Sequence, residues 1–129
     1  MVRYTKFTYN QRYYNCTESS DIGMCILGYF LANDVNFHSS SFKQFAKNPN
    51  EDITGSNITA LEKEDGYVYL RDLYSEEKIP TQLKMTIQQF IQLLDDWETK
   101  VCKARPQEVM IIHENNAFTI EVVQEQHKS

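Results

Sequence analysis

Residues 81–123 carry the strongest pattern in the chain and restrict its fold more than any other stretch. Thr86 precedes Gln89 by three positions, the spacing of a capping box at the start of a helix. Apolar side chains then recur at helical intervals, at Ile87, Phe90, Ile91, Leu94, Trp97 and Val101. Pro106 prevents the helix from continuing. The pattern predicts an amphipathic helix that packs one apolar stripe against a sheet.

Strands are predicted on both sides of this helix. Residues 82–85 precede it and form a segment long enough for a short strand. Residues 109–113 and 117–123 follow it and flank an asparagine-rich turn at residues 114–116. Asparagine tolerates the left-handed backbone of tight turns, so these segments predict a closing β-hairpin.

The Asp65-Gly66 pair predicts another hairpin, formed by residues 58–63 and 67–74. Asp-Gly suits the two positive-φ positions of a type I′ turn. This turn places Glu62 opposite Tyr69 and gives the hairpin one apolar face, with Leu61, Val68 and Leu70. The other face is predicted to meet solvent, and it carries Glu62, Glu64, Tyr67, Tyr69 and Arg71.

The N-terminal part of the chain has a weaker pattern. Residues 2–9 alternate loosely and predict either a short strand or an extended arm. Residues 22–33 follow Ser20 and Asp21, either of which can cap a helix. We favour this helix over a buried strand across residues 24–30, because of the length of the apolar segment and the cap.

Two further features lie between this helix and the Asp-Gly hairpin. The serine run at residues 39–41 can cap a short helix over residues 41–46. Gly55 lies at the centre of a predicted turn at residues 53–57.

These elements together predict an α+β fold. An antiparallel sheet of two hairpins and a short strand packs against one main amphipathic helix, with an N-terminal arm and one or two short helices. We expect residues 1–129 to form a single domain. Within it, residues 1–56 hold the arm and short helices, residues 57–123 the core, and residues 124–129 a frayed tail.

The cysteines do not suggest a disulfide framework. Cys16, Cys25 and Cys102 are odd in number and widely spaced, which predicts reduced thiols. Cys25 lies among apolar residues and is expected to be an inert core thiol, whereas Cys16 is expected to be exposed.

The histidines do not suggest a metal site. His38, His113 and His127 lie far apart, outside any metal-binding spacing, and His113 is expected to be a solvated turn residue. We therefore predict no catalytic residue, no metal and no cofactor. The enzymatic alternative is a site assembled across the fold with Cys16 or His38.

The charge and the termini restrict the partner and the compartment. The net charge is −5, whereas a nucleic-acid-binding protein needs a basic surface to neutralise phosphates. The first residues contain no apolar signal-peptide region, so we expect a cytoplasmic protein that spans no membrane.

Acidic and tyrosine side chains form the candidate binding surface. Tyrosines among carboxylates suit contact with a basic protein, because complementary charge orients the encounter. The alternative is an ordinary solvated sheet face with cross-strand pairs. The candidate partner-binding residues are Glu62, Glu64, Tyr67, Tyr69, Asp72, Asp95, Asp96 and Glu98.

Two segments resemble parts of a known class of proteins. NITALEKEDGYVYLRDLYSEEK, residues 57–78, and MTIQQFIQLLDDWETKVCK with PQEVMIIHENNAFTIEVV, within residues 85–123, are similar in architecture to small acidic bacterial immunity proteins. These antitoxins accompany polymorphic toxins, including those of contact-dependent growth inhibition systems. The resemblance covers residues 57–123 and transfers no functional residue.

The resemblance implies a cytoplasmic, non-enzymatic protein that binds one toxin domain, commonly a nuclease, and blocks its active site or substrate surface. A nuclease must be basic to hold RNA or DNA, so an acidic partner suits it. We expect the target to be a ribonuclease. The alternative function is that of a small acidic adaptor or regulatory subunit of a cytoplasmic complex. The oligomeric state is left open.

Overall fold

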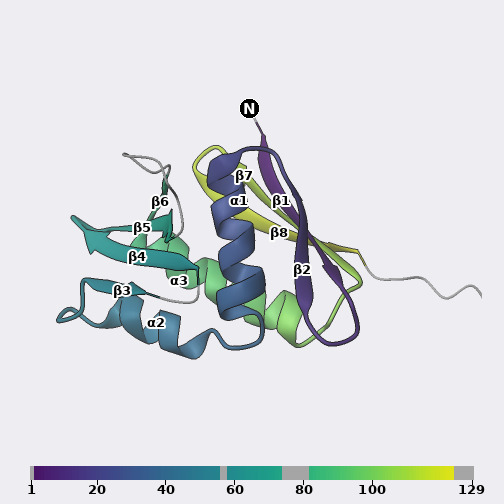
Figure 1. The fold of residues 1–129 in the computed structure, drawn as a ribbon, viewed down its shortest axis with the longest axis horizontal. Coiled ribbons are helices and arrows are strands. Elements are labelled where there is room, and N and C mark those ends of the chain that lie inside the picture. Colours follow the sequence, from purple (N-terminus) through teal and green to yellow (C-terminus); the bar gives the residue numbers. More distant parts are fainter. Residues whose placement is uncertain (1, 56–57, 74–81, 124–129) are drawn as a thin grey trace, which may run out of the picture.

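The computed structural model describes residues 2–55, 58–73 and 82–123 and has an α+β fold with two antiparallel sheets (Figure 1). Sheet A has four strands in the order β2-β1-β7-β8, namely β2 (Tyr14–Ser19), β1 (Arg3–Tyr9), β7 (Glu108–Glu114) and β8 (Ala117–Val123). Sheet B has the order β3-β4-β5-β6, namely β3 (Ile53–Gly55), β4 (Thr59–Glu64), β5 (Tyr67–Asp72) and β6 (Gln82–Thr86).

Helices pack against the strands of the sheets and against one another. They are α1 (Ile22–Tyr29) with the π-helical turn η1 (Phe30–Val35), α2 (Ser40–Lys47), and α3 (Ile87–Asp96) with the π-helical turn η2 (Trp97–Cys102). Helix α1 contacts β1 and β2 of sheet A as well as β5 and β6 of sheet B, and α3 contacts β5, β6 and β8. The predicted α+β class and the packing of a main helix on a sheet are thus confirmed.

The residues predicted as a strand or an arm form the strand β1 inside sheet A. This strand pairs with both β2 and β7, with Phe7 opposite Val109 and Thr5 opposite Ile111. The closing hairpin therefore pairs with the N-terminal strands and not with the Asp-Gly hairpin. As a result, the single sheet predicted from the sequence is replaced by two separate sheets. Pairing between strands this far apart in sequence leaves no local signal.

Both predicted hairpins are confirmed with their turns. In the first, Glu62 lies opposite Tyr69, and φ is 52° at Asp65 and 85° at Gly66. In the second, φ is 53° at Asn115 and 62° at Asn116. Residues with positive φ at both central positions match the right-handed twist of the strands they join.

The two predicted helix starts are confirmed as well. The side chain of Asp21 accepts a hydrogen bond from Met24 N at 3.0 Å, so residues 24–30 belong to a helix and not to a strand. At α3, Thr86 and Gln89 form both hydrogen bonds of the capping box. Residues of the predicted apolar stripe, such as Phe90 and Trp97, are buried.

Two local predictions between α1 and β4 are wrong. Residues 53–55, predicted as part of a turn, form the edge strand β3, whereas residues 56–57 lie outside the described part. Helix α2 forms as predicted, but Ser39 at its N-cap makes no capping hydrogen bond with its side chain. Its hydroxyl donates instead to Glu98, in a contact between distant parts of the chain.

Trp97 lies at the centre of a core that contains residues of both sheets. Its side chain is fully buried, with its ring centroid 5.0 Å from that of Phe7 and 5.8 Å from that of Tyr14. Its indole N–H donates to the backbone oxygen of Asn36 at 2.6 Å. The same core cluster includes Leu70 of sheet B, so both sheets pack on one hydrophobic core.

Gly28 allows α1 to lie close to sheet A. A Cβ atom at this position would meet Cys16 Sγ at 2.6 Å and would also contact the Thr5 hydroxyl. None of the helices that the structure describes is long and apolar enough to cross a membrane. The predicted frayed tail, residues 124–129, and the charged segment 75–78 lie outside the described residues.

Candidate binding surfaces

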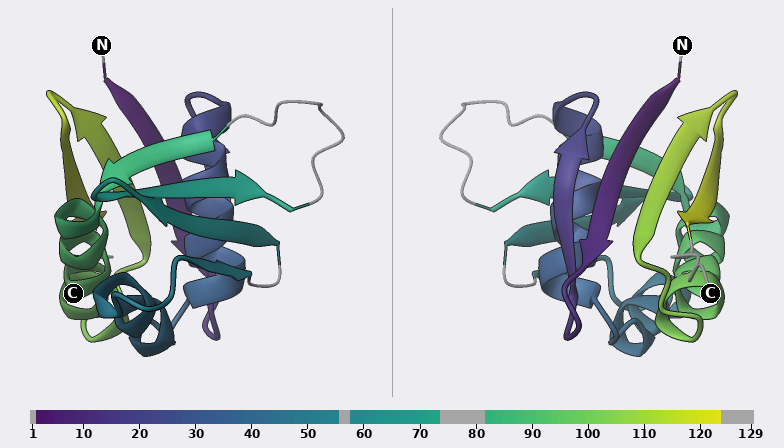
Figure 2. Two further views of the ribbon diagram at one scale, coloured as in Figure 1. Left: turned by 90° about the vertical axis from the view of Figure 1, so that its left-hand side faces the viewer. Right: turned by 90° about the vertical axis from the view of Figure 1, so that its right-hand side faces the viewer.

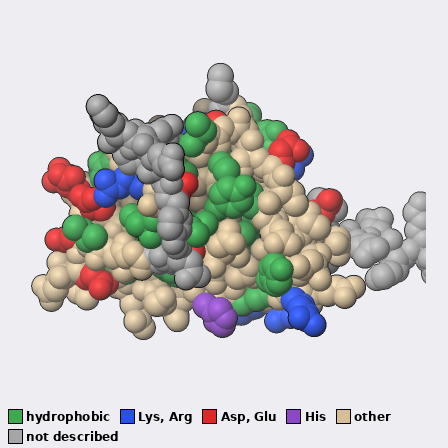
Figure 3. Space-filling view, in the orientation of Figure 1, with side chains coloured by type: hydrophobic (Ala, Val, Ile, Leu, Met, Phe, Trp, Pro, Cys, Tyr) green, Lys and Arg blue, Asp and Glu red, His purple; other side chains and the backbone are tan. Residues whose placement is uncertain are grey.

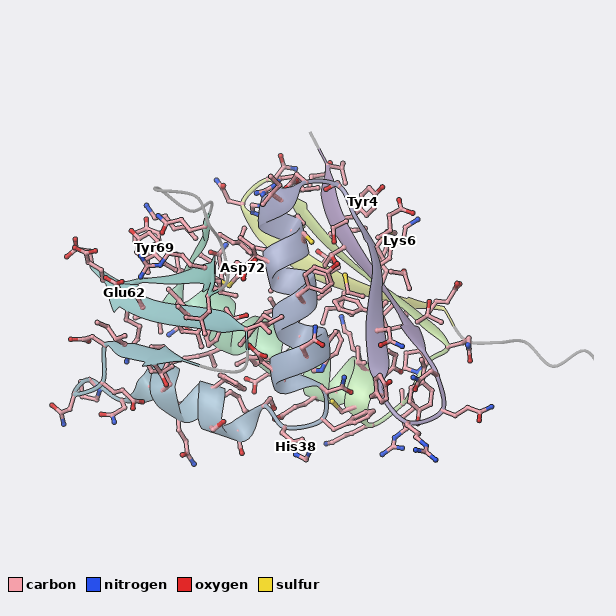
Figure 4. The ribbon with its side chains drawn as sticks, viewed as in Figure 1. Tyr4, Lys6, His38, Glu62, Tyr69 and Asp72 are labelled. Atoms are coloured by element: carbon pink, nitrogen blue, oxygen red, sulfur yellow. The ribbon has the colours of Figure 1, made fainter. Side chains whose placement is uncertain are left out.

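The outer face of sheet B brings together four of the predicted site residues (Figure 2, left). Strand pairing places Ile53, Glu62, Tyr69 and Lys84 side by side across all four strands. The neighbouring row holds Glu64, Tyr67 and Thr86. Helix α1 lies on the opposite side of the sheet, so these side chains face away from the core (Figures 2 and 4).

This surface, called the sheet B face below, is mixed in charge rather than acidic. Arg71 Nη2 donates to Glu62 Oε2 at 2.6 Å. Lys84 Nζ lies 4.0 Å from the ring centroid of Tyr67 and 5.8 Å from that of Tyr69. Two bases thus accompany Glu62 and Glu64, and Lys84 contacts both aromatic rings. Arg71 lies on this face as the hairpin register predicts, and Lys84 of β6 adds a base that the hairpin alone does not contain.

The acids predicted on the helix belong to a different contact. Lys43 Nζ of α2 donates to Asp95 Oδ1 at 3.1 Å and to Glu98 Oε2 at 2.8 Å. The hydrogen bond from Lys43 to Glu98, with that from Ser39, holds the pKa of Glu98 below its ordinary value. Asp96 accepts a hydrogen bond from Gln92 at 2.9 Å. Asp95 of α3 and Glu98 of η2 therefore hold α2 against these helical segments and do not extend the sheet B face.

Asp72 lies at the end of β5 on the side that faces α1 (Figure 4). Burial is the main reason why the pKa of the Cys25 thiol is raised, and the charge of Asp72 raises it further. Because alternate residues of a strand point to opposite faces, Asp72 does not share the surface of Tyr69 and Arg71. Of the eight predicted residues, four therefore meet on the sheet B face.

The three cysteines are free and half-buried. Burial raises the pKa of the Cys102 thiol to about 11. Cys16, predicted to be exposed, places its sulfur 3.3 Å from the Thr5 hydroxyl beneath α1. A thiol held in the neutral form is a weak nucleophile, so the geometry does not activate Cys25 or Cys102.

The histidines differ from the predictions at one position. His113, expected as a solvated turn residue, lies in β7 with its ring stacked on Phe118 at a centroid distance of 4.2 Å. Its Nδ1 is 3.3 Å from Arg3 Nη1, and burial lowers its pKa. His38 is exposed and lies below α1 at the lower edge of the view in Figure 4, away from Glu62 and Tyr69. Within the described ranges, no three His, Cys, Asp or Glu side chains are placed to share a metal ion.

A groove between β2 and α1 was not predicted from the sequence. It has a volume of about 330 Å³ and is lined by Cys16, Thr17, Glu18, Ser19, Asp21, Ile22, Cys25 and Tyr29. Hydrophobic side chains gather over α1 on this face of the molecule (Figure 3). The spacing of Ile22, Cys25 and Tyr29 on one side of α1, away from the buried stripe, is the signal in the sequence that indicates it.

Comparisons with protein-family models, with curated proteins and with solved structures found no match. The function is therefore argued from the surfaces of this chain. Two of them combine exposed apolar or aromatic side chains with charged groups: the sheet B face and the groove between β2 and α1.

Proposed function

We propose that this protein is an immunity protein that binds a nuclease toxin and neutralises it by covering its active site or substrate surface. We propose further that this toxin is a ribonuclease. The sheet B face is the proposed contact. The observation that carries this proposal is the row of Ile53, Glu62, Tyr69 and Lys84, in which an aliphatic, an acidic, an aromatic and a basic side chain adjoin across the four strands of one sheet.

The aromatic side chains of this face suit a tight contact because neighbouring groups hold them. Lys84 lies over Tyr67 at 4.0 Å, and the ion pair between Arg71 and Glu62 fixes the charges beside Tyr69. Tyrosine and arginine are enriched among residues that dominate binding energy. Side chains that are ordered before binding lose less conformational entropy when the partner arrives.

The two kinds of charge on this protein have different roles in the proposal. The net charge of −5 attracts a basic nuclease over distances of about a Debye length, roughly 8 Å at physiological salt. The alternating charges of Glu62, Arg71 and Lys84 set the register of the contact at short range. In this proposal, the net negative charge of the whole protein steers the encounter, and the side chains of the sheet B face recognise the partner.

A titration of nuclease activity tests the proposal. The nuclease encoded beside this chain in its native genome would be purified, and its cleavage of labelled RNA measured with increasing amounts of this protein. We expect activity to fall linearly to zero near one equivalent. Full activity at saturating protein would contradict the proposal, and binding without inhibition would favour the adaptor alternative.

Charge reversal at Glu64 tests the surface. Glu64 is exposed and makes no ion pair with another described residue, whereas reversal of Glu62 would also break its pair with Arg71. We expect Glu64→Lys to weaken binding by about tenfold at low salt and less at high salt. Glu121→Lys, on the exposed edge strand of sheet A, is the matched control and should bind as the wild type does. Equal effects of both variants would remove the sheet B face from the proposal.

A further inference from the structure

We propose that the end of the molecule formed by three chain connections binds a short acidic segment of another protein. The connections are residues 10–13 between β1 and β2, residues 36–39 between η1 and α2, and residues 103–107 between η2 and β7. They lie at the lower edge of Figure 1 and are called the basic end below. This inference goes beyond the proposed function, since it concerns a different surface and a partner of opposite charge.

The charge of the basic end differs from that of the rest of the chain. It carries Arg12, Lys103 and Arg105, all of them exposed, and its sequence contains no aspartate or glutamate. All 18 acidic side chains of this chain therefore lie elsewhere. Along the lower edge of Figure 3, Lys and Arg side chains lie beside hydrophobic side chains and a histidine.

Arg105 joins the three connections and is held by neutral groups. Its Cζ lies 4.8 Å from the ring centroid of Phe37, and its Nη1 donates to the Tyr9 hydroxyl at 3.2 Å. That hydroxyl donates to the backbone oxygen of Gln11 at 3.3 Å. Glu108, the acid closest to Arg105 in sequence, lines a hollow on sheet A instead. A guanidinium stacked on a ring keeps its in-plane donors for a carboxylate.

The turn between β1 and β2 presents a second cation beside an aromatic ring. Asn10 Oδ1 accepts hydrogen bonds from the backbone N–H groups of Arg12 and Tyr13, at 3.0 and 2.9 Å. Asn10 N donates to Tyr13 O at 3.1 Å, which closes the turn. The turn leaves the Arg12 side chain exposed and Tyr13 47% exposed. Charge and aromatic surface are thus offered together.

Arg12 and Arg105 are the cations that remain available to a partner. Neither makes an ion pair with another described residue. Lys103 is partly engaged, because its charge adds to the effect of Lys43, whose hydrogen bond is the main cause of the lowered pKa of Glu98. The two arginines therefore carry the proposed recognition, and the lysine contributes less.

The backbone of the basic end is held in conformations that side chains other than glycine disfavour. Gln11, Asn36 and Arg105, one in each connection, have φ of 82°, 41° and 49°. The other non-glycine residues with positive φ in the described part lie in the two hairpin turns. Asn36 is fixed by hydrogen bonds with Tyr14 and by the indole N–H of Trp97. Such backbone is concentrated at functional sites, where the surrounding structure holds it.

The rest of the molecule decides which anion fits. A long polyanion such as RNA would extend from the basic end over the acidic remainder of the protein, which repels it. A short acidic segment of a protein needs only the basic end itself. The exposed ring of Tyr13 suits an aromatic side chain placed among the carboxylates of that segment.

The test uses a blocked synthetic peptide with two glutamates on each side of one tyrosine, followed by the amide NMR shifts of the protein. Salt at about 0.1 M limits charge effects to about 10 Å, so that distant acids contribute little. We expect saturable shifts at residues 10–13, 36–39 and 103–107, with a Kd below about 1 mM. A peptide with glutamine in place of every glutamate should bind at least about tenfold more weakly.

Matched variants locate the peptide. Arg12→Gln and Arg105→Gln should each weaken binding by about threefold or more, because each removes one contact between opposite charges. Lys47→Gln removes the same charge from an exposed residue at the end of α2 and should bind the peptide as the wild type does. Arg12 lies in an exposed turn, so its variant keeps the test valid if Arg105→Gln disturbs the fold.

Four results would each overturn the inference. They are equal binding of the glutamine peptide, equal losses in Arg12→Gln and Lys47→Gln, shifts centred outside the basic end, and no saturable shift at about 1 mM peptide. A uridine oligonucleotide of equal charge distinguishes the two classes of anion, and tighter binding of this probe than of the peptide would assign the basic end to nucleic acid. None of these measurements involves the nuclease, so failure here leaves the proposed function intact.

Discussion

Asp21 connects three elements at the N-terminal end of α1. Its carboxylate accepts two hydrogen bonds from the Arg3 guanidinium of β1, at 2.9 and 2.8 Å, and another from the backbone N–H of Met24 in α1. Arg3 in turn lies 3.3 Å from His113 of β7. One side chain thus caps a helix and ties it to two strands of sheet A.

The pair of Asp21 and Arg3 predicts a loss of stability in acid. The guanidinium holds the pKa of Asp21 well below its ordinary value. A carboxyl group with a lowered folded pKa stabilises the fold above its unfolded pKa of about 4, and this contribution disappears as pH falls through the folded pKa. Because the two side chains are 32% and 37% exposed, we expect only about 1 kcal/mol at pH 7.

Urea unfolding followed by the fluorescence of Trp97 measures this effect in the wild type and in Asp21→Asn. Asparagine retains the capping oxygen and removes the charge. The variant should be less stable at pH 7, and the difference should shrink below about pH 4. A difference that stays constant over this range would show that the ion pair does not stabilise the fold.

The cap at Asp21 could be predicted from the sequence, but its partner could not. A cap and the helix it begins are neighbours in the chain, so polar residues before an apolar run suffice to indicate it. Arg3 lies 18 positions away, and its approach depends on how β1 and α1 pack. The same reason explains why the surroundings of His113 were missed.

At the scale of elements, the contact between α2 and α3 explains the acids that the sequence suggested for binding. Lys43 joins α2 to Asp95 and Glu98, and Ser39 adds a hydrogen bond to Glu98. An acidic helix side looks the same in a sequence whether it meets solvent, a partner protein or a lysine from another helix. Only the packing of α2 decides between these outcomes.

Glu98→Gln is predicted to destabilise the fold, with Asp96→Asn as its control. Loss of the Glu98 charge weakens the contacts with Lys43 and Ser39, which we expect to cost about 1 kcal/mol after allowance for partial exposure. The side chain of Asp96 bonds only to Gln92 among the described residues, and its replacement should change stability by less than about 0.5 kcal/mol. If thermal or urea unfolding showed the same loss of unfolding free energy for both variants, the contact of Glu98 with α2 would not contribute to the stability of the fold.

Elements whose signals are local were predicted well. The Asp65-Gly66 turn fixes its own strand register, and Thr86 with Gln89 marks the start of α3. The strand β3 was missed because it is a short edge strand that gains its structure by pairing with β4. The division into two sheets was missed because the β1–β7 pairing joins residues from opposite ends of the chain.

At the scale of the whole molecule, the two sheets share one core through α1, α3 and η2. Trp97 contacts Phe7 and Tyr14 of sheet A, and α3 also packs on strands of sheet B. The segment 57–123, which the sequence suggested as the core, lacks β1 and β2, so its strand β7 has lost one of its two neighbours.

We therefore predict that a fragment of residues 57–123 does not fold alone. Without β1 and α1, the apolar faces of both sheets would be exposed to water, and a chain of this length has little apolar surface to spare. The amide spectrum of the fragment should show the narrow shift range of an unfolded chain. A dispersed spectrum would contradict the description of a single core.

We propose that the sheet B face is the surface that binds the nuclease. Tyr69 lies in the middle of this face, and Tyr4 lies on β1 in sheet A and provides a matched tyrosine elsewhere (Figure 4). Replacement of a tyrosine at the centre of an interface by alanine commonly reduces the binding free energy by more than about 1 kcal/mol. A difference between these two sites therefore identifies the contact.

The most direct measurement is the affinity of the nuclease for Tyr69→Ala and for Tyr4→Ala, by calorimetric titration of folded proteins. We predict that Tyr69→Ala binds at least about tenfold more weakly than the wild type, and that Tyr4→Ala stays within about threefold. A loss of affinity in Tyr4→Ala with unchanged binding by Tyr69→Ala would contradict the account and would move the contact to sheet A.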